Sequence, residues 1–237
     1  MRGIALLVMF ASTLAHGAWN EYVETRDLRL DASGISTLEI DAGAGGLTVK
    51  GDPGVTEIVV AATITVPEDD EDKARAYMEK SMVLTLDRDN DAARLRSYFE
   101  SGLFSWGQQG SVALDVTLPQ SLSLVIDDGS GSIEISDVGG SLFVDDGSGG
   151  IRILDTGGDV EIDDGSGGIL VAGAAGNVRV TDGSGSMTIE RVAGSVYVDD
   201  GSGSIDVSDV LQDLIVEDDG SCGIDHDGVL GQVIIDQ

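Results

Sequence analysis

The C-terminal half of the chain repeats a pattern every eighteen residues. From Leu122 the sequence divides into rows of nine residues, which begin LSLVIDDGS, GSIEISDVG, GSLFVDDGS and GGIRILDTG. The third and fifth places of almost every row are apolar and often β-branched, as at Ile133 and Ile135 or at Leu142 and Val144. This alternation predicts a short strand with one buried face. Because only every second row ends in Asp-Asp-Gly-Ser, the full repeat consists of two short strands and two different corners.

Two all-β topologies could use this repeat. An antiparallel meander would leave a thin sheet of strands about three to five residues long, with one bare apolar face, which is too little to be stable alone. A parallel β-solenoid coils the chain instead, so that successive laps stack and their apolar faces meet inside. Since like corners recur at like positions, we predict a parallel β-solenoid (β-helix) of six or so laps, stacked at about 4.8 Å per lap.

The residues before the repeat follow the same pattern less regularly. Ile58 to Val66 predicts a longer strand, and Pro67 then opens an acidic stretch from Glu68 to Asp72 that is typical of the first turn of a helix. Ala74 and Met78 continue at helical spacing. We therefore expect one short helix in this part of the chain.

These patterns divide the chain into three segments. Residues 1–17 are predicted to be a signal peptide, and residues 18–121 an irregular β portion with the helix near residues 68–82. Residues 122–237 are predicted to form the regular solenoid. Aromatic and apolar residues gather before the repeat, at Tyr98, Phe99, Leu103, Phe104 and Trp106. They suggest a cap over one end of the stacked laps, because repeat stacks need atypical end units to cover their core, and a binding patch is the alternative.

The signal peptide is inferred from the first residues of the chain. Arg2 provides a positive start, Gly3 to Ala15 is apolar, and small residues precede a cut ahead of Ala18. The apolar run is too short to span a bilayer and no second run follows it, so we expect no stable membrane insertion. The expected product is exported, either periplasmic or secreted.

The charge of the chain excludes several partners. Forty-three acidic residues against thirteen basic ones give a formal net charge of −30. Nucleic acids and anionic membranes repel such a surface, whereas divalent cations are possible partners. Cys222 is the only cysteine, so no internal disulfide is expected. With 41% hydrophobic residues the chain can still bury a core, so disorder is not expected.

Stacked laps would place the doubled aspartates of every second corner in two columns, about 5 Å apart between laps. The first column is Asp127, Asp145, Asp163 and Asp199, and the second is Asp128, Asp146, Asp164, Asp182 and Asp200. In the structural interpretation, aspartate and serine side chains bond their own turn backbone while glycine takes positive φ values. In the alternative, calcium bridges the carboxylates.

Catalytic and ligand-binding motifs are weak in this sequence. Calcium-binding nonapeptide repeats carry aspartate just before the next apolar place, where this chain has serine or glycine. His226 occupies a usually apolar place between Asp225 and Asp227, and the Gly-Ser stretches lack the lysine of a phosphate loop. Carboxylate pairs occur everywhere and so do not indicate glycoside hydrolysis. We therefore predict no catalytic residue, no cofactor and no metal ligand.

The fourth place of each row is expected to face outward and to form two further columns. One column is Glu134, Arg152, Leu170, Thr188, Asp206 and Asp225, and the other is Phe143, Glu161, Arg179, Tyr197, Ile215 and Ile234. We expect cross-lap ion pairs between Glu134 and Arg152 and between Glu161 and Arg179. The apolar members of the second column could contribute to an exposed contact surface.

Two stretches of the chain resemble a known family. They are RDLRLDASGISTLEIDAGAGGLTVKG at Arg26–Gly51 and VALDVTLPQSLSLVIDDGSGSIEISDVGGSLFV at Val112–Val144. With the signal peptide before them, they resemble the bacterial "putative adhesin" domain of unknown function. The resemblance implies an exported parallel β-helix with short Gly-Ser-Gly repeats in the cell envelope, and it implies no catalytic residues. The acidic corners and the scarcity of lysine depart from the family pattern.

The sequence thus favours a non-enzymatic, exported cell-envelope protein that acts as an adhesin-like interaction scaffold for a protein or glycan partner. A calcium-binding or cation-stabilised secreted module is the alternative. A polysaccharide-acting β-helix enzyme is the second alternative, because some β-helices act on glycans.

Overall fold

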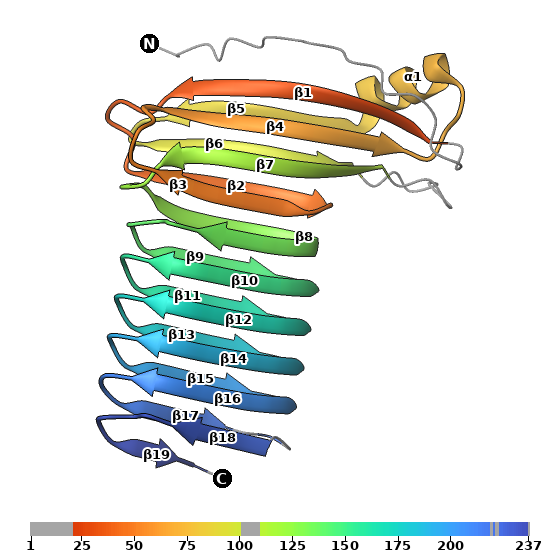
Figure 1. Ribbon diagram of the computed structural model, residues 1–237. Coiled ribbons are helices and arrows are strands. Elements are labelled where there is room, and N and C mark those ends of the chain that lie inside the picture. Colours follow the sequence, from red (N-terminus) through yellow and green to blue (C-terminus); the bar gives the residue numbers. More distant parts are fainter. Residues whose placement is uncertain (1–20, 101–109, 219, 221–222, 237) are drawn as a thin grey trace.

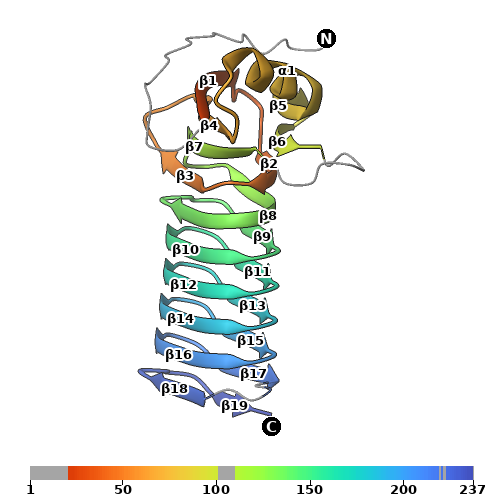
Figure 2. The same cartoon turned by 90° about the vertical axis from the view of Figure 1, so that its right-hand side faces the viewer.

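The computed structural model describes residues 21–100, 110–218, 220 and 223–236. The predicted signal peptide, Leu103, Phe104, Trp106 and Cys222 lie outside the described residues. The predicted fold is confirmed: the chain forms a parallel β-solenoid of about six laps with a spacing of about eighteen residues, together with one short helix. Figures 1 and 2 show a rod of stacked laps with an irregular cap at one end. No helix among these residues is long and apolar enough to cross a membrane.

Each regular lap contains one strand in each of two facing parallel sheets. Sheet A contains β10 (Gly149–Thr156), β12 (Gly167–Ala174), β14 (Gly185–Val192), β16 (Gly203–Val210) and β18 (Gly223–Asp227). Sheet B contains β9 (Leu142–Asp146), β11 (Val160–Asp164), β13 (Val178–Asp182), β15 (Val196–Asp200), β17 (Leu214–Asp218) and β19 (Val233–Ile235). The long strand β8 (Ser123–Ser136) takes part in both sheets.

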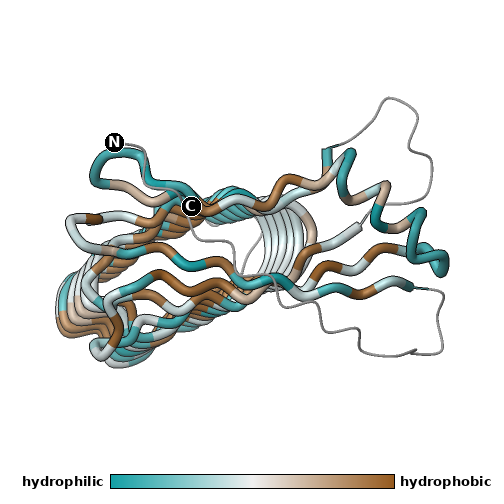
Figure 3. Tube along the Cα trace, turned by 90° about the horizontal axis from the view of Figure 1, so that it is seen from above, coloured by the Kyte–Doolittle hydropathy of each residue, from teal (hydrophilic) through white to brown (hydrophobic). Residues whose placement is uncertain are grey.

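The register between laps is fixed by the repeat. Ile151 pairs with Ile169 in sheet A and Val160 pairs with Val178 in sheet B, so each of these residues lies against its equivalent eighteen positions later. After Val198 the register shifts by one residue, and equivalent residues then lie nineteen positions apart. This parallel register excludes the antiparallel meander for the repeat. Seen from above, the successive laps overlie one another (Figure 3).

The core lies between the two sheets. The third and fifth places of the rows point into it, as predicted, and Ile153, Val171 and Ile162 are each at most 1% exposed. Burying a side chain of this kind stabilises the fold by about 1.5–3 kcal/mol. Because the same two places are apolar in lap after lap, the core continues along the regular part of the rod.

The N-terminal part of the chain forms the cap and the first lap. Its strands are β1 (Tyr22–Asp31), β2 (Thr37–Ala44), β3 (Leu47–Asp52), β4 (Glu57–Val66), β5 (Met82–Asp89), β6 (Ala92–Phe99) and β7 (Ser111–Pro119). Strands β2 and β3 stack in parallel on the two halves of β8 and so form the first lap. Antiparallel pairs β1–β4, β4–β7 and β5–β6 cover this lap.

The single helix, α1 (Glu71–Ser81), lies within the cap. The Asp70 side chain accepts a hydrogen bond from the backbone N–H of Lys73 at 3.1 Å and so caps the first turn. Ala74 and Met78 are buried against the cap, because helical spacing places them on one face.

Candidate functional site

The doubled aspartates of the Asp-Asp-Gly-Ser corners separate into a buried column and an exposed one. Strand residues alternate between the two faces of a sheet, so of two adjacent aspartates one points inward and the other outward. The buried column, named here the inner aspartate ladder, is 0–3% exposed and consists of Asp128, Asp146, Asp164, Asp182 and Asp200. The exposed column, named the outer aspartates, consists of Asp127, Asp145, Asp163 and Asp199.

The members of the inner aspartate ladder are register partners in successive strands of sheet B. Asp128 of β8 lies beside Asp146 of β9, and the pairing continues through Asp164, Asp182 and Asp200. Neighbouring strands lie about 4.8 Å apart, so five like carboxyl groups follow one another at this spacing.

One oxygen of each carboxyl group belongs to the turn. The backbone N–H of the residue two positions later donates to Oδ1, from Ser148 to Asp146 at 3.2 Å and from Ser184 to Asp182 at 3.0 Å. The same contact holds Asp164 and Asp200. The structural interpretation of the corner, in which aspartate bonds its own turn, is therefore confirmed for Oδ1.

The second oxygen has no such role. Within the described part of the chain, Oδ2 is buried without a hydrogen-bond partner in four members of the ladder, namely Asp128, Asp146, Asp164 and Asp182. A buried acceptor that lacks a donor costs about 1–3 kcal/mol, and more when it is charged. The burial of this oxygen was not predicted from the sequence. It could have been, because the third and fifth places of each nine-residue row point inward and the aspartates occupy the seventh place, which continues this alternation.

Burial changes the acidity of these groups. Burial, assisted by the charge of Asp146, raises the pKa of Asp128 to about 7. Burial likewise raises the pKa of Asp182 to about 6, and the turn N–H of Ser184 opposes this only in part. The pKa values of Asp146 and Asp164 are also raised, mainly by burial. These four carboxyl groups of the ladder therefore bind protons more tightly than exposed aspartates do.

The structure also shows how potential metal-binding and catalytic side chains are arranged. In the residues that the structure describes, no group of three or more His, Cys, Asp or Glu side chains is arranged to hold a metal ion. His226 lies in β18 as the register partner of Val207, and its side chain is exposed. The structure does not bring it together with the aspartate columns of the corners, which lie in sheet B.

A second feature is the column of outward-facing side chains on sheet B. This sheet B outer column consists of Val125, Phe143, Glu161, Arg179, Tyr197, Ile215 and Ile234, which are register partners lap by lap. Val125, Phe143 and Ile234 are 37–42% exposed, which is high for apolar side chains on a regular strand. The column therefore presents apolar and aromatic groups along the rod.

The charged members of this column do not pair as predicted. Glu161 and Arg179 are register neighbours, but Arg179 contacts Tyr197 and Glu217 instead. Its guanidinium carbon lies 4.7 Å from the centroid of the Tyr197 ring, and its Nη1 lies 3.6 Å from Glu217 Oε2. The predicted ion pair between Glu134 and Arg152 is also wrong, because these register neighbours lie beyond ion-pair distance of each other. Exposed long side chains gain little from such pairs, so register alone does not decide them.

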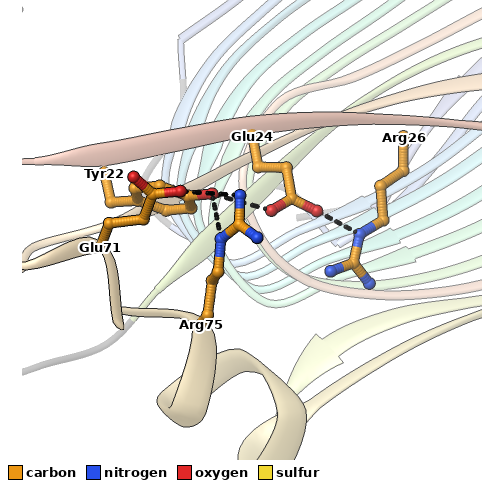
Figure 4. Close-up of polar contacts among 5 residues, drawn as sticks. All are labelled: Tyr22, Glu24, Arg26, Glu71 and Arg75. Atoms are coloured by element: carbon orange, nitrogen blue, oxygen red, sulfur yellow. Dashed lines mark hydrogen bonds and ion pairs between the residues drawn. The ribbon is translucent and has the colours of Figure 1, made fainter. Parts of the chain in front are cut away.

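A cluster of polar side chains joins helix α1 to strand β1 within the cap (Figure 4). The Tyr22 hydroxyl donates to Glu24 at 3.0 Å and accepts a hydrogen bond from Arg75 at 3.1 Å. Arg75 also pairs with Glu71 at 2.8 Å, and Arg26 donates to Glu24 at 2.7 Å. This cluster connects α1 to β1 and acts as a tether.

Comparisons with known proteins gave structural matches alone. No family model and no curated protein matches the chain. A solved structure described as a putative cell adhesion protein from Clostridium sporogenes is 12% identical, with 90% of this chain and 98% of that chain covered and a TM-score of 0.38. A putative adhesin from Bacteroides fragilis is 10% identical, with 90% and 97% covered and a TM-score of 0.40. One from Parabacteroides distasonis is 8% identical, with the same coverage and a TM-score of 0.35.

The names of these proteins agree with the family that the sequence resembles. Their identities and TM-scores are too low to assign a ligand or an activity to this chain.

Proposed function

We propose that this protein is a non-enzymatic interaction scaffold of the cell envelope, which binds a protein or glycan partner along the sheet B outer column. The observation that supports the proposal is that five of the seven members of this column are apolar or aromatic and that three of these, Val125, Phe143 and Ile234, are exposed. Phe143 and Ile234 are exposed on regular strands, where a side chain without a contact role is commonly polar.

The shape of this column suits an extended partner. Adjacent strands place equivalent side chains about 4.8 Å apart from lap to lap, so the column is long and narrow. The Tyr197 ring is held by the Arg179 guanidinium at 4.7 Å, which fixes its orientation before any partner binds. A ring fixed in advance loses less conformational entropy on binding than a mobile one.

The proposal is tested by removing the two aromatic side chains of the column. The double variant Phe143→Ala, Tyr197→Ala is compared with Leu170→Ala, Thr188→Ala, which changes the outward column of sheet A in neighbouring laps. Cosedimentation with peptidoglycan sacculi and with protein-free envelope polysaccharide measures glycan binding, and protease-treated envelopes measure the protein contribution. We expect the first variant to lose about tenfold or more in affinity, as aromatic contact residues commonly do. Equal binding by both variants would contradict the proposal.

Absence of catalysis is part of the proposal and has its own measurement. The same polysaccharides are incubated with the protein, and new reducing ends are counted. If a freshly purified preparation still releases reducing ends, this result would favour the alternative that the protein is a glycan-acting enzyme.

A further inference from the structure

We propose that the inner aspartate ladder is a proton-binding site, in which protons rather than metal ions neutralise the buried carboxyl groups and so stabilise this corner of the solenoid. The inference is independent of the interaction surface, because the ladder points inward while the sheet B outer column points outward.

The geometry of each carboxyl group leads to this inference. Oδ1 accepts the N–H of the turn in Asp146, Asp164 and Asp182. In these three residues and in Asp128, Oδ2 is buried without a partner. Every member of the ladder is at most 3% exposed, so solvent cannot screen an ionised group. A proton on Oδ2 removes the charge that burial penalises, and it leaves the hydrogen bond at Oδ1 in place.

The neighbours of each group strengthen the effect. Within the described residues, the charged groups that act on Asp128, Asp146, Asp164 and Asp182 are other aspartates, from the ladder itself and from the outer aspartates. Carboxyl groups at this spacing cannot all ionise freely, because neighbouring carboxylates repel each other. We therefore expect the groups of successive laps to titrate together, with a protonated carboxyl group beside a carboxylate.

Basic side chains of the packed strands lie elsewhere. The inward places of β10, β12, β14 and β16 are apolar except for Thr156, and none of them is charged. Apart from the inner aspartate ladder and the outer aspartates, the charged residues of β8 to β17 are exposed or half-buried on the outside. They are Glu134, Arg152, Asp155, Glu161, Arg179, Glu190, Arg191, Asp206, Asp209, Glu217 and Asp218. No cationic side chain in the described part of these strands therefore neutralises the ladder.

A metal ion fits these oxygens poorly. Calcium takes six to eight oxygen ligands, whereas Asp128, Asp146, Asp164 and Asp182 each offer one buried carboxyl oxygen without a partner. The described residues contain no arrangement of three ligating side chains. A proton needs no coordination shell, so it matches one oxygen per lap.

The adjacent aspartates offer a matched pair of variants for the test. Asp128→Asn changes the inner aspartate ladder at the group whose pKa is raised to about 7, and Asp127→Asn changes the outer aspartates; each variant removes one formal charge from β8. Infrared spectra of the folded full chain, recorded against pH, follow the C=O stretch of protonated carboxyl groups. At a pH of about 6, well above the ordinary pKa of aspartate, we expect this band in the wild type and in the outer variant. We expect it to be roughly halved or weaker in the inner variant.

Melting temperatures with and without calcium, at matched ionic strength, provide the second measurement. We expect calcium to leave the difference in melting temperature between the inner and outer variants unchanged. A calcium-induced rise that the outer variant keeps and the inner variant loses would overturn the proposal in favour of a metal site. Absence of the protonated band in the folded wild type at a pH of about 6 would overturn it as well, and this reading stands even if the inner variant fails to fold.

Discussion

The Oδ1 atom of Asp159 accepts a hydrogen bond at 2.7 Å from the backbone N–H of Asn177, one lap later in the chain. The same place continues this contact in the following laps, because Asn177 accepts from Ser195 at 2.9 Å and Asp213 accepts from Gln232 at 2.7 Å. These side chains connect consecutive laps at the corner opposite the inner aspartate ladder. Each lap is thus joined to the next by side chains as well as by the backbone.

Removal of one such contact tests its contribution. Asp159→Ala leaves the Asn177 N–H without its side-chain acceptor, so we expect the free energy of unfolding to fall by about 1 kcal/mol. Asp163→Ala is the control, since it removes an equally acidic side chain from an exposed place on the same lap. Denaturant unfolding measures both, and equal losses would show that the contact contributes nothing of its own.

The glycines of the Asp-Asp-Gly-Ser-Gly corner differ in what they tolerate. A Cβ on Gly149, whose φ is +148°, would lie 1.6 Å from the carbonyl oxygen of Gly131 in the previous lap. A Cβ on its neighbour Gly150 would have 3.8 Å to the nearest atom. We expect Gly149→Ala to destabilise the fold by about 3 kcal/mol or more, and Gly150→Ala to change it by less than about 1 kcal/mol. Circular dichroism during thermal unfolding distinguishes the two, and similar melting temperatures would contradict the close packing of laps.

Among the described residues, the opposite corner contains four in the left-handed region that are not glycine, namely Asp137, Asp155, Arg191 and Asp209. Arg191 has a φ of 58°, at the place where Gly173 stands one lap earlier. Such a backbone costs a side-chain-bearing residue roughly 1–2 kcal/mol, so Arg191→Gly should be more stable than Arg191→Ala by about 1 kcal/mol. Both variants remove the arginine charge and its contact with Glu190, so the difference in unfolding free energy isolates the backbone. An alanine variant as stable as the glycine variant would refute this explanation.

The inner aspartate ladder predicts the sign of the pH dependence. The pKa values of Asp128, about 7, and Asp182, about 6, lie above the ordinary value of 3.8 that applies when the chain is unfolded. Between a pH of about 4 and about 7 the folded state therefore binds more protons, and stability falls as pH rises through this window. We expect Asp128→Asn to flatten the dependence while the exposed control Asp127→Asn leaves it nearly intact. Unfolding free energies at constant ionic strength measure this, and a stability that rises across the window in all three proteins would oppose it.

The cap depends on the contact between Tyr22 and Arg75. Arg75→Ala removes the hydrogen bond to the Tyr22 hydroxyl and the pair with Glu71, so α1 should open more often while the laps stay protected. Lys73→Ala is the control, because this exposed lysine on the same helix has a single 3.8 Å pair, with Asp70. Hydrogen exchange resolved by segment shows the effect, which we expect to be about fivefold or more in the helix. Uniform acceleration across the laps would instead mean that the cap and the rod open together.

The regular laps could be predicted because the eighteen-residue repeat indicates which residues pair between successive laps. Ile151, Ile169 and Met187 occupy the same place eighteen residues apart, so the parallel stack follows from the repeat. The burial of Asp146 was equally accessible, since the inward alternation of Leu142 and Val144 continues to it. Its partnerless oxygen was not, because that depends on where the turn N–H points.

The cap was less predictable, for a physical reason. Strands β1, β4 and β7 pair antiparallel without any repeat, so no place in one marks its partner in the next. The contact of Arg179 with Tyr197 was also missed, since an exposed arginine chooses among several neighbours within reach.

The uniform register has a consequence for the size of the molecule. In the regular part, each lap pairs with the lap before it and the lap after it, and equivalent residues meet at every step. Deleting residues 165–182 would bring Asp164 next to Gly183, which reproduces the order Asp-Gly of the original corner. A gene can therefore lengthen or shorten the rod in units of eighteen codons, about 4.8 Å at a time, while the cap and the inward apolar places of the remaining laps are kept.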